Sequence, residues 1–199
     1  MIQTPDTETE FSFSPLTAEL WPDLEKVFGK KGAMQGCWCM RWRISRRQFE
    51  QQRGERNKRM LRRGIERGLV NGVLAYADEE PVGWCSIGSR ENFPELENSS
   101  VLARVDRKPV WAVVCFFVLR RYRGQRLSVG LLEAAKDYAR EQGAVALEGY
   151  PIVPRQGKLP LAATWTGFAG PFNEAGFKEV ERRVDVRPIV RFNFPRKRR

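Results

Sequence analysis

The sequence contains no histidine among its 199 residues. Catalytic triads of serine, histidine and aspartate, and dyads of cysteine and histidine, need an imidazole as their base, so both classes of enzyme are excluded. Any proton transfer must instead use a carboxylate, tyrosine, cysteine, lysine, an N-terminal amine, the backbone or water.

Cysteine is scarce as well. The four cysteines, Cys37, Cys39, Cys85 and Cys115, are too few and too irregularly spaced for a disulfide framework, so we expect reduced thiols. Cys37 and Cys39 could supply two metal ligands, but no histidine and no second close pair of cysteines completes a tetrahedral zinc site. We therefore predict no metal. Cys115, in the middle of the most strand-like segment, is interpreted as a buried core thiol.

Long apolar runs are missing. No stretch approaches the roughly 20 apolar residues of a membrane span, and residues 1–10 are polar and acidic rather than typical of a signal peptide. These absences predict a soluble cytoplasmic protein with no membrane partner. The length and the 42% hydrophobic content suit one core. We expect a single domain over residues 1–199, with flexible ends at 1–9 and 195–199.

Acidic residues are outnumbered. Lysine and arginine total 35 against 24 aspartates and glutamates, which gives a formal charge of +11. Such a field attracts anionic ligands, which could be a phosphorylated cofactor, a nucleic acid or an acidic protein. Part of the excess lies in residues 41–67 and part in the tail at 195–199. The tail is typical of a solvated chain end, with nucleic-acid contact as the alternative.

Hydrophobic periodicity predicts regular elements in the first half of the chain. They are a strand at 10–14, a helix over 15–28, one or two basic helices within 45–67 broken near Gly54, and a hairpin of 72–77 and 82–88 with Pro81 at its turn. Residues 30–42, rich in glycine, cysteine and tryptophan, are expected to form a loop with buried aromatic side chains. Residues 89–108 are expected to be a polar connection.

The second half reads as strands alternating with helices. The expected order is a strand at 110–119 buried on both faces, a basic turn at 120–128, a helix to about Gln142, a strand at 144–150, a proline-bearing loop at 151–166, a short helix within 167–176, and closing strands within 177–186 and 190–194.

The basic turn at 120–128 carries the strongest chemical signal. A helix N-terminus presents unpaired backbone N–H groups and the positive end of its dipole, so it can hold phosphate oxygens. Arg121, Arg123 and Arg126 add positive charge, and Gly124 lets the backbone approach a phosphate without a side chain in the way. The alternative is an ordinary strand-to-helix turn with exposed arginines.

Two motifs resemble those of the GNAT N-acetyltransferase superfamily. Residues 121–126, Arg-Tyr-Arg-Gly-Gln-Arg, match the signature Arg/Gln-x-x-Gly-x-Gly/Ala at its first and fourth positions. Residues 172–177, Phe-Asn-Glu-Ala-Gly-Phe, resemble the Tyr-x-x-x-Gly-Phe pattern that follows in many members. The order of elements agrees over roughly residues 10–186, although the N-terminal third matches in layout more than in residues.

The resemblance implies an α/β fold with a mixed, mostly antiparallel sheet of six or seven strands, splayed at the central strand, with helices on both faces. It implies acetyl-CoA as cofactor and direct transfer of acetyl to a primary amine, with no acyl-enzyme. The cofactor-binding residues it implies are Phe116, Phe117 and Val118 for the pantetheine arm, the turn residues Arg121, Arg123, Gly124, Gln125, Arg126, Leu127 and Ser128 for the pyrophosphate, and Phe172.

The chain departs from the family pattern at two positions. Arg126 stands where the signature has glycine or alanine, so either its side chain turns outward and pairs with phosphate, which we favour, or the turn is distorted. Phe172 stands where many members have a tyrosine that protonates the leaving thiolate, and phenylalanine cannot donate a proton. The general acid is therefore displaced, replaced by water, or absent.

Glu148 and Tyr150 are the candidate catalytic pair. Alternation along the strand at 144–150 puts both on one face, where a carboxylate and a phenol could serve as base and acid. In the alternative reading, Glu148 pairs with an arginine and Tyr150 packs. Residues 37–42 and 164–166 are candidates for an aromatic wall of the acceptor pocket, or for local core.

The sequence leaves the acceptor open. We expect an acyltransferase, acting on groups other than aminoacyl groups, that acetylates a small molecule, peptide or protein amine. One alternative acceptor is a nucleic-acid-linked amine such as aminoacyl-tRNA, a partner class that is not favoured. The other alternative is a non-catalytic module on the same fold that senses CoA or binds nucleic acid. A homodimer is left open.

Overall fold

The computed structural model describes residues 9–154 and 164–195, and these form one seven-stranded sheet in the order β1-β2-β3-β4-β5-β7-β6. Every neighbouring pair is antiparallel except β4 with β5, which is parallel. The strands are β1 (Phe11–Pro15), β2 (Asn71–Ala77), β3 (Glu80–Ser89), β4 (Trp111–Val118), β5 (Ala146–Gly149), β6 (Lys178–Arg182) and β7 (Pro188–Asn193). The predicted fold class is confirmed.

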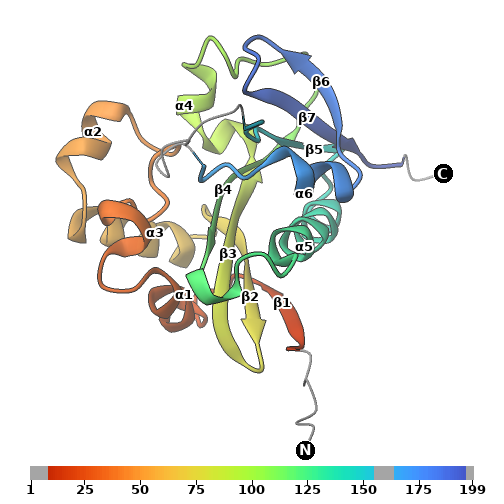
Figure 1. Cartoon of the computed structure of the whole chain (residues 1–199). Coiled ribbons are helices and arrows are strands. Elements are labelled where there is room, and N and C mark those ends of the chain that lie inside the picture. Colours follow the sequence, from red (N-terminus) through yellow and green to blue (C-terminus); the bar gives the residue numbers. More distant parts are fainter. Residues whose placement is uncertain (1–8, 155–163, 196–199) are drawn as a thin grey trace, which may run out of the picture.

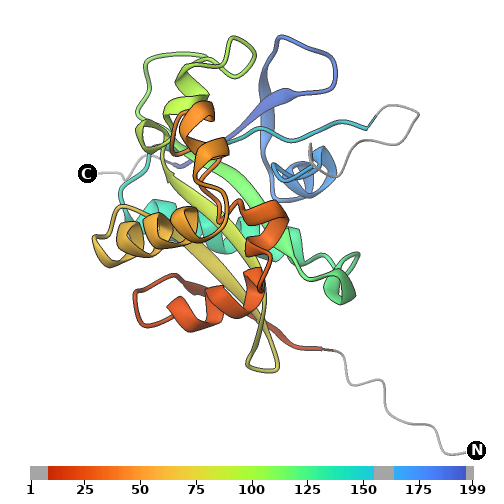
Figure 2. The ribbon, with the colours of Figure 1, turned by 90° about the vertical axis from the view of Figure 1, so that its left-hand side faces the viewer.

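Helices cover both faces of the sheet (Figures 1 and 2). The helix α5 lies against one face, and α1 and α3 lie on the other, with α2 beside them. The helices are α1 (Trp21–Phe28), α2 (Arg46–Gln51), α3 (Glu55–Glu66), α4 (Pro94–Glu97), α5 (Leu127–Glu141) and α6 (Ala169–Glu174), with short helical turns at Gly32–Gly36, Arg90–Asn92 and Arg120–Tyr122. Among the helices of the described ranges, none has the length and apolar character to cross a bilayer.

Successive side chains of β2 point to opposite faces of the sheet and so belong to two different parts of the core. Val73 and Ala75 point to the α5 side, where they pack with Leu131 and other buried residues of that helix. Leu74 points to the opposite side and packs with Trp84 and the apolar residues of α1. Because successive strand side chains alternate between faces, this central hairpin fixes helices above and below the sheet.

The sheet opens between β4 and β5. Their parallel pairing covers only Trp111 to Val113 of β4, opposite Leu147 to Gly149 of β5. Residues 114–118 continue β4 without a partner strand on that side, while their other edge stays paired with β3. The predicted splay at the central strand is therefore present, and half of β4 exposes backbone polar groups to whatever fills the opening.

Two sequence expectations about boundaries were wrong. The first helix begins at Trp21 rather than at residue 15, because Pro15 ends β1 and the Leu16 N–H extends the ladder to the Gly72 carbonyl at 2.9 Å. The hairpin turns at Asp78 and Glu79, which both have positive φ (47° and 70°) as a two-residue hairpin loop requires. Pro81 instead lies in β3, opposite Tyr76 at an irregularity in the register, where its missing N–H is tolerated.

Most other elements overlap the predicted ranges, and α2 and α3 are separated at Gly54 as expected. Residues 89–108 were expected to be a polar connection, but they contain α4, because Phe93, Leu96 and Leu102 are buried in a core cluster of their own. The last strand, β7, begins at Pro188, two residues before its predicted range. The expected chain ends, 1–9 and 195–199, fall almost wholly on residues 1–8 and 196–199, outside the described residues. Most of the loop expected at 151–166 also falls outside them, at 155–163.

Candidate functional site

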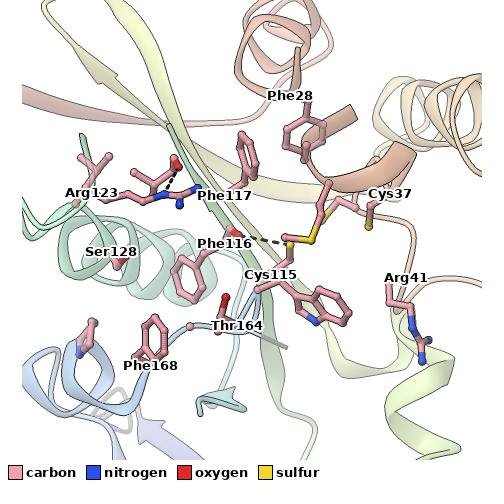
Figure 3. Close-up of a pocket in the computed structure, with 18 of the residues that line it drawn as sticks. Phe28, Cys37, Arg41, Cys115, Phe116, Phe117, Arg123, Ser128, Thr164 and Phe168 are labelled. Atoms are coloured by element: carbon pink, nitrogen blue, oxygen red, sulfur yellow. Dashed lines mark hydrogen bonds between the residues drawn. The ribbon is translucent and has the colours of Figure 1, made fainter. Parts of the chain in front are cut away.

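A groove of about 1050 Å³ follows the open edge of β4 (Figure 3). At one end it is lined by the turn before α5, including Arg123, Gly124 and Ser128. At the other end it is lined by the loop that carries Cys37 and Arg41, and by α2. The groove thus joins the predicted phosphate-binding turn to the cysteine-rich and aromatic loop. These segments lie roughly 80 to 90 residues apart in the sequence.

The N-terminus of α5 has the properties of an anion site. The N–H groups of Val129 and Gly130 both donate to the Arg126 carbonyl, at 2.8 and 3.3 Å, so the preceding N–H groups of Leu127 and Ser128 lack an acceptor within the helix. Gly124 has φ of 78°, and no atom lies within 4 Å of the position a Cβ would take. Bare backbone at a helix N-terminus can approach phosphate oxygens closely.

The arginines of this turn have separate partners. Arg123 lines the groove and donates from Nε to the Val118 carbonyl at 3.0 Å. Arg121 pairs with Glu80 of the β2–β3 hairpin, away from the groove. The Gln125 side chain donates to the Arg121 carbonyl at 3.1 Å and does not line the groove either. Arg121 and Gln125 therefore hold the turn, whereas Arg123 faces the cavity.

Arg126 has φ of 59°, in the left-handed region. A residue without a β-carbon adopts this conformation at least cost, which explains the glycine of the family signature. The Arg126 side chain turns outward, as expected, but its partner in this structure is Glu174 of α6, and both residues line the groove. Its predicted pairing with phosphate stays a prediction.

Only alternate residues of β4 present backbone groups to the groove. The Phe116 N–H points into the opening and donates to the Trp165 carbonyl at 2.6 Å, whereas the Leu119 N–H points to β3 and donates to Val82 at 3.0 Å. By alternation Phe116 and Val118 face the opening, and the backbone of Phe117 faces β3. Phe117 contributes its ring, which lies edge-on to Phe28 at 5.9 Å.

Phe172 is fully buried at the base of the opening. Its ring meets Phe116 edge-on at 5.8 Å, and a Cβ at Gly149 would overlap it at 2.0 Å. Phe172 is thus fitted into the core and forms an apolar wall of the groove. It supplies no proton donor where many family members have a tyrosine.

Glu148 and Tyr150 are buried together but do not line the groove. The Tyr150 hydroxyl donates to Glu148 at 3.0 Å and accepts from Arg90 at 2.6 Å. Arg191 binds the other oxygen of Glu148 through Nε at 3.0 Å and Nη2 at 2.6 Å. Burial and the neighbouring Glu148 raise the pKa of Tyr150 well above its usual value.

The prediction that Glu148 and Tyr150 share a face is confirmed by their hydrogen bond. Their assignment as catalytic base and acid stays a prediction, and this enclosed placement favours the alternative, in which Glu148 pairs with arginines and Tyr150 packs.

The far end of the groove combines aromatic and charged side chains. Trp42, Phe49 and Trp165 line it together with Arg41, Arg46, Arg53 and Glu50. Arg41 pairs with Glu95 at 2.9 Å, and Arg53 pairs with Glu50 at 2.7 Å. The predicted aromatic wall lies here, and Trp38 between the two cysteines is instead buried against Trp21 and Phe28.

Cysteines also line this end of the groove. Cys115 was expected to be a buried core thiol, but it is only partly buried and lines the groove, because β4 has no partner on its β5 side beyond Val113. Cys39 lines it as well and accepts a hydrogen bond from the Trp84 indole at 3.3 Å. The sequence indicated a core position for Cys115 and, for Cys39, a place in the aromatic wall or in an incomplete metal site. Within the described residues, no group of three or more cysteine, aspartate and glutamate side chains could hold a metal.

These features fit coenzyme A. The anion site at α5 suits the diphosphate, and the exposed edge of β4 suits the extended arm. The groove continues from them to the acceptor end, where the reactive end of the cofactor would lie. Two contacts compete with the arm, since the Trp165 carbonyl accepts from the Phe116 N–H and Arg123 donates to the Val118 carbonyl.

Comparisons with known proteins agree with this geometry. The model of the acetyltransferase (GNAT) family matches residues 35–153. PaiA N-acetyltransferase from Thermoplasma acidophilum, solved in complex with coenzyme A, has a TM-score of 0.51 and 16% identity, over 93% of this chain and 99% of that one. No curated protein is significantly similar in sequence.

Two further solved structures have similar folds. A putative acetyltransferase from Acinetobacter baylyi has a TM-score of 0.54 at 13% identity, over 94% of this chain and 95% of that one. The ribosomal-protein-S5-alanine acetyltransferase from Vibrio fischeri has a TM-score of 0.50 at 12% identity, over 94% of both chains. Identities this low establish the fold alone.

Proposed function

Because this chain belongs to the acetyltransferase (GNAT) family, we propose that it transfers the acetyl group of acetyl-CoA directly to a primary amine of a small molecule, peptide or protein. The observation that carries the proposal is the opening of the sheet beside β4, which begins at the N-terminus of α5 and ends at a pocket large enough for an acceptor. Most of the predicted cofactor-binding residues line this opening, whereas Arg121, Gln125, Glu148 and Tyr150 do not.

The cofactor, when bound, supplies an activated acetyl thioester. The N–H groups of Leu127 and Ser128 and the bare backbone at Gly124 would hold its diphosphate, with charge from Arg123 and Arg126. The backbone of Phe116 and Val118 would pair with its arm, and the rings of Phe117 and Phe172 would pack beside it. Arg121 and Gln125 support the turn from outside the groove.

The acceptor end favours an amine that carries an apolar part and an anionic or carbonyl group. Trp42 and Phe49 offer apolar contact, and three arginines surround a single glutamate among the charged residues that line this end. The residues here bind and orient the amine and exclude water, which are the main demands of direct transfer. A polycationic acceptor is disfavoured by the same charges.

The test is product detection by mass spectrometry after incubation with acetyl-CoA and a panel of primary amines. We expect acetylated products from amino acid, peptide or aromatic amine acceptors, and little product from polyamines. An absence of acetylated product from every amine, with acetyl-CoA bound, would contradict the transferase and favour the CoA-sensing module.

Adding aminoacyl-tRNA to the same panel distinguishes a nucleic-acid-linked acceptor from a small-molecule or peptide acceptor. Aminoacyl-tRNA acetylation with affinity that falls steeply as salt rises would favour the basic surface of α2 and α3 as a tRNA contact. If the amines react and RNA does not bind at low salt, the small-molecule or peptide acceptor is supported.

A further inference from the structure

Arg43 follows Arg41 and Trp42, which line the acceptor end of the groove, and has no carboxylate partner among the described residues. Among the described residues it forms no ion pair, its Nε atom is buried without a hydrogen-bond partner, and its Nη2 donates to Ser86 at 3.1 Å. The guanidinium also lies over the Phe93 ring, 4.6 Å from its centroid. An enclosed guanidinium stays protonated and is costly without an anion, so the site calls for a negative charge that no carboxylate supplies.

The Cys39 sulfur is placed to carry that charge. It accepts from the Trp84 indole at 3.3 Å. The neighbouring Cys115 thiol donates to the Phe116 carbonyl at 3.8 Å. Cys39 is 5% exposed, and it lines the groove beside Cys115, the residue that precedes the arm-binding edge of β4. Figure 3 shows Cys115 lying between Phe116 and the loop that bears Cys37.

The backbone holds Cys39 in an uncommon conformation. Trp38 and Cys39 have φ of 44° and 55°, a region that costs a non-glycine residue about 1 kcal/mol or more and persists only where surrounding contacts impose it. The buried Trp38 ring and the Trp84 bond to the Cys39 sulfur impose it here. Strain of this kind clusters at functional sites, and here it directs the sulfur toward β4.

The charges around the cluster favour ionisation of one thiol. The pKa of Cys39 is lowered to about 6, first by hydrogen bonding with Cys115. The charge of Arg43 and the donors Trp84 and Ser86 act in the same direction, and burial opposes them. The pKa values of the neighbouring thiols are raised instead. Burial raises the pKa of Cys37 to about 11 and also raises that of Cys85. The hydrogen bond with Cys39, together with burial, raises the pKa of Cys115. These thiols and Arg43 are the titratable groups that face Cys39.

We propose that Cys39 is a thiolate, held by the Trp84 indole and the charge of Arg43, that takes the proton from the acceptor amine. The proposal deepens the proposed function and rests on it. The Cys39 base replaces the buried Glu148 as the group with access to the groove, and Arg43 acts as a positioning residue through its charge.

The step is a proton transfer whose atoms balance. An N–H bond of the acceptor ammonium breaks, its electron pair stays on nitrogen, and the proton binds the Cys39 sulfur, from which it passes to water. Nitrogen is then free to act as a nucleophile. A base ionised near neutral pH is matched to this task, since it is charged under working conditions and still accepts a proton.

The first test needs no cofactor. The ultraviolet absorbance of thiolates is titrated in the wild-type chain, in Cys39→Ala and in Arg43→Gln, which requires no access of a reagent to the buried sulfur. We expect one thiolate to titrate near pH 6 in the wild type, to vanish in Cys39→Ala, and to titrate at higher pH in Arg43→Gln. The thiolate is refuted if wild type and Cys39→Ala titrate alike below pH 9.

The second test measures binding and turnover separately. Cys39→Ala should keep the acetyl-CoA affinity, lose about 100-fold in kcat and lose the acidic limb of the pH profile, an effect typical of a missing general base. Cys85→Ala, a matched control in β3 outside the groove, should retain kcat. Unchanged kcat and pH profile in Cys39→Ala would overturn the base role. Failure of the wild type to bind acetyl-CoA would overturn the proposed function and the role with it, while the cofactor-free titration still reports the thiolate.

Discussion

Two arginine sites, one around Arg90 and Arg191 and the other at Arg43, differ in how their charge is balanced. Arg90 and Arg191, both nearly inaccessible, share Glu148 and are further paired with Glu97 and Asp106. Arg90 also donates to two backbone carbonyls, those of Leu96 at 3.3 Å and Leu102 at 2.6 Å. Arg43, by contrast, has a hydroxyl, an aromatic ring and the sulfur cluster as its surroundings.

The difference separates structure from chemistry. A network in which each charged group meets an opposite charge away from the groove has its hydrogen bonds satisfied, and removal of one partner destabilises the fold. A cation that has no carboxylate partner and lies near a thiol beside a cavity lowers the pKa of that thiol and makes it more reactive. The sequence connected Glu148 with catalysis, and its enclosure among arginines away from the groove favours the structural role that was the alternative.

The largest effect on stability should follow Glu148→Gln. The amide leaves two arginines without their shared carboxylate, and we expect a loss of about 3–5 kcal/mol in the free energy of unfolding. Chemical denaturation measures it, with Glu179→Gln as the exposed control, since Glu179 pairs with Arg182 at the surface and should change stability by less than about 1 kcal/mol. A stable Glu148→Gln with lost turnover would restore Glu148 as a catalytic base.

A smaller loss should follow Tyr150→Phe. The substitution keeps the ring but removes the hydroxyl that accepts from Arg90 and donates to Glu148, which should cost about 1–3 kcal/mol because a buried donor is left unpaired. Denaturation of this variant beside the wild type measures the loss. Turnover should survive once the temperature is lowered enough to keep the variant folded, and a selective loss of kcat would contradict the structural role.

The pH dependence of stability should report the second site. The pKa of Cys39 is lowered in the folded state, to about 6 from an ordinary value of 9, so the unfolded chain binds more protons in this window. Folding stability from this group is therefore complete above pH 9 and is lost as pH falls to 6. The melting temperature of the wild type relative to Cys39→Ala should rise between pH 6 and 9, and a difference independent of pH would contradict the thiolate.

The smallest effect should come from Arg121→Ala. Arg121 and Glu80 are exposed partners, so stability should change by at most about 1 kcal/mol. Since Arg121 lies off the groove, acetyl-CoA affinity measured by calorimetry should fall little, and less than in Arg123→Ala. A larger loss in Arg121→Ala would return the first signature arginine to the phosphate site.

The sequence predicted what local patterns control. The buried strand at 110–119, the helix after the glycine-bearing turn and the closing strands all carry periodicity or turn signals within one short window. The end of β1 was mispredicted because residues 15–20 have helical spacing, yet Leu16 is held by a ladder bond to Gly72, which lies more than 50 residues away in the sequence.

Site residues could be predicted only where the signal was local. The turn at 121–128 was found through its glycine and its place before a helix, whereas the partners of Glu148 come from Arg90 and Arg191 at distant positions. For the thiol site a signal did exist: no aspartate or glutamate stands between Glu25 and Glu50, so an enclosed arginine in that loop lacks a local carboxylate. Its meeting with Cys115 and Ser86 depends on the tertiary fold.

The measurement that tests the groove most directly compares two glycines at opposite ends of α5. Gly124 and Gly143 have φ of 78° and 80°, and neither has an atom within 4 Å of an added Cβ, so leucine at either should strain the backbone to a similar degree. If the groove binds acetyl-CoA, the cofactor should raise the melting temperature of the wild type and Gly143→Leu but not of Gly124→Leu. If acetyl-CoA stabilises both variants equally, the groove does not bind the cofactor through the turn at Gly124. If it stabilises neither the variants nor the wild type, the groove is not an acetyl-CoA site.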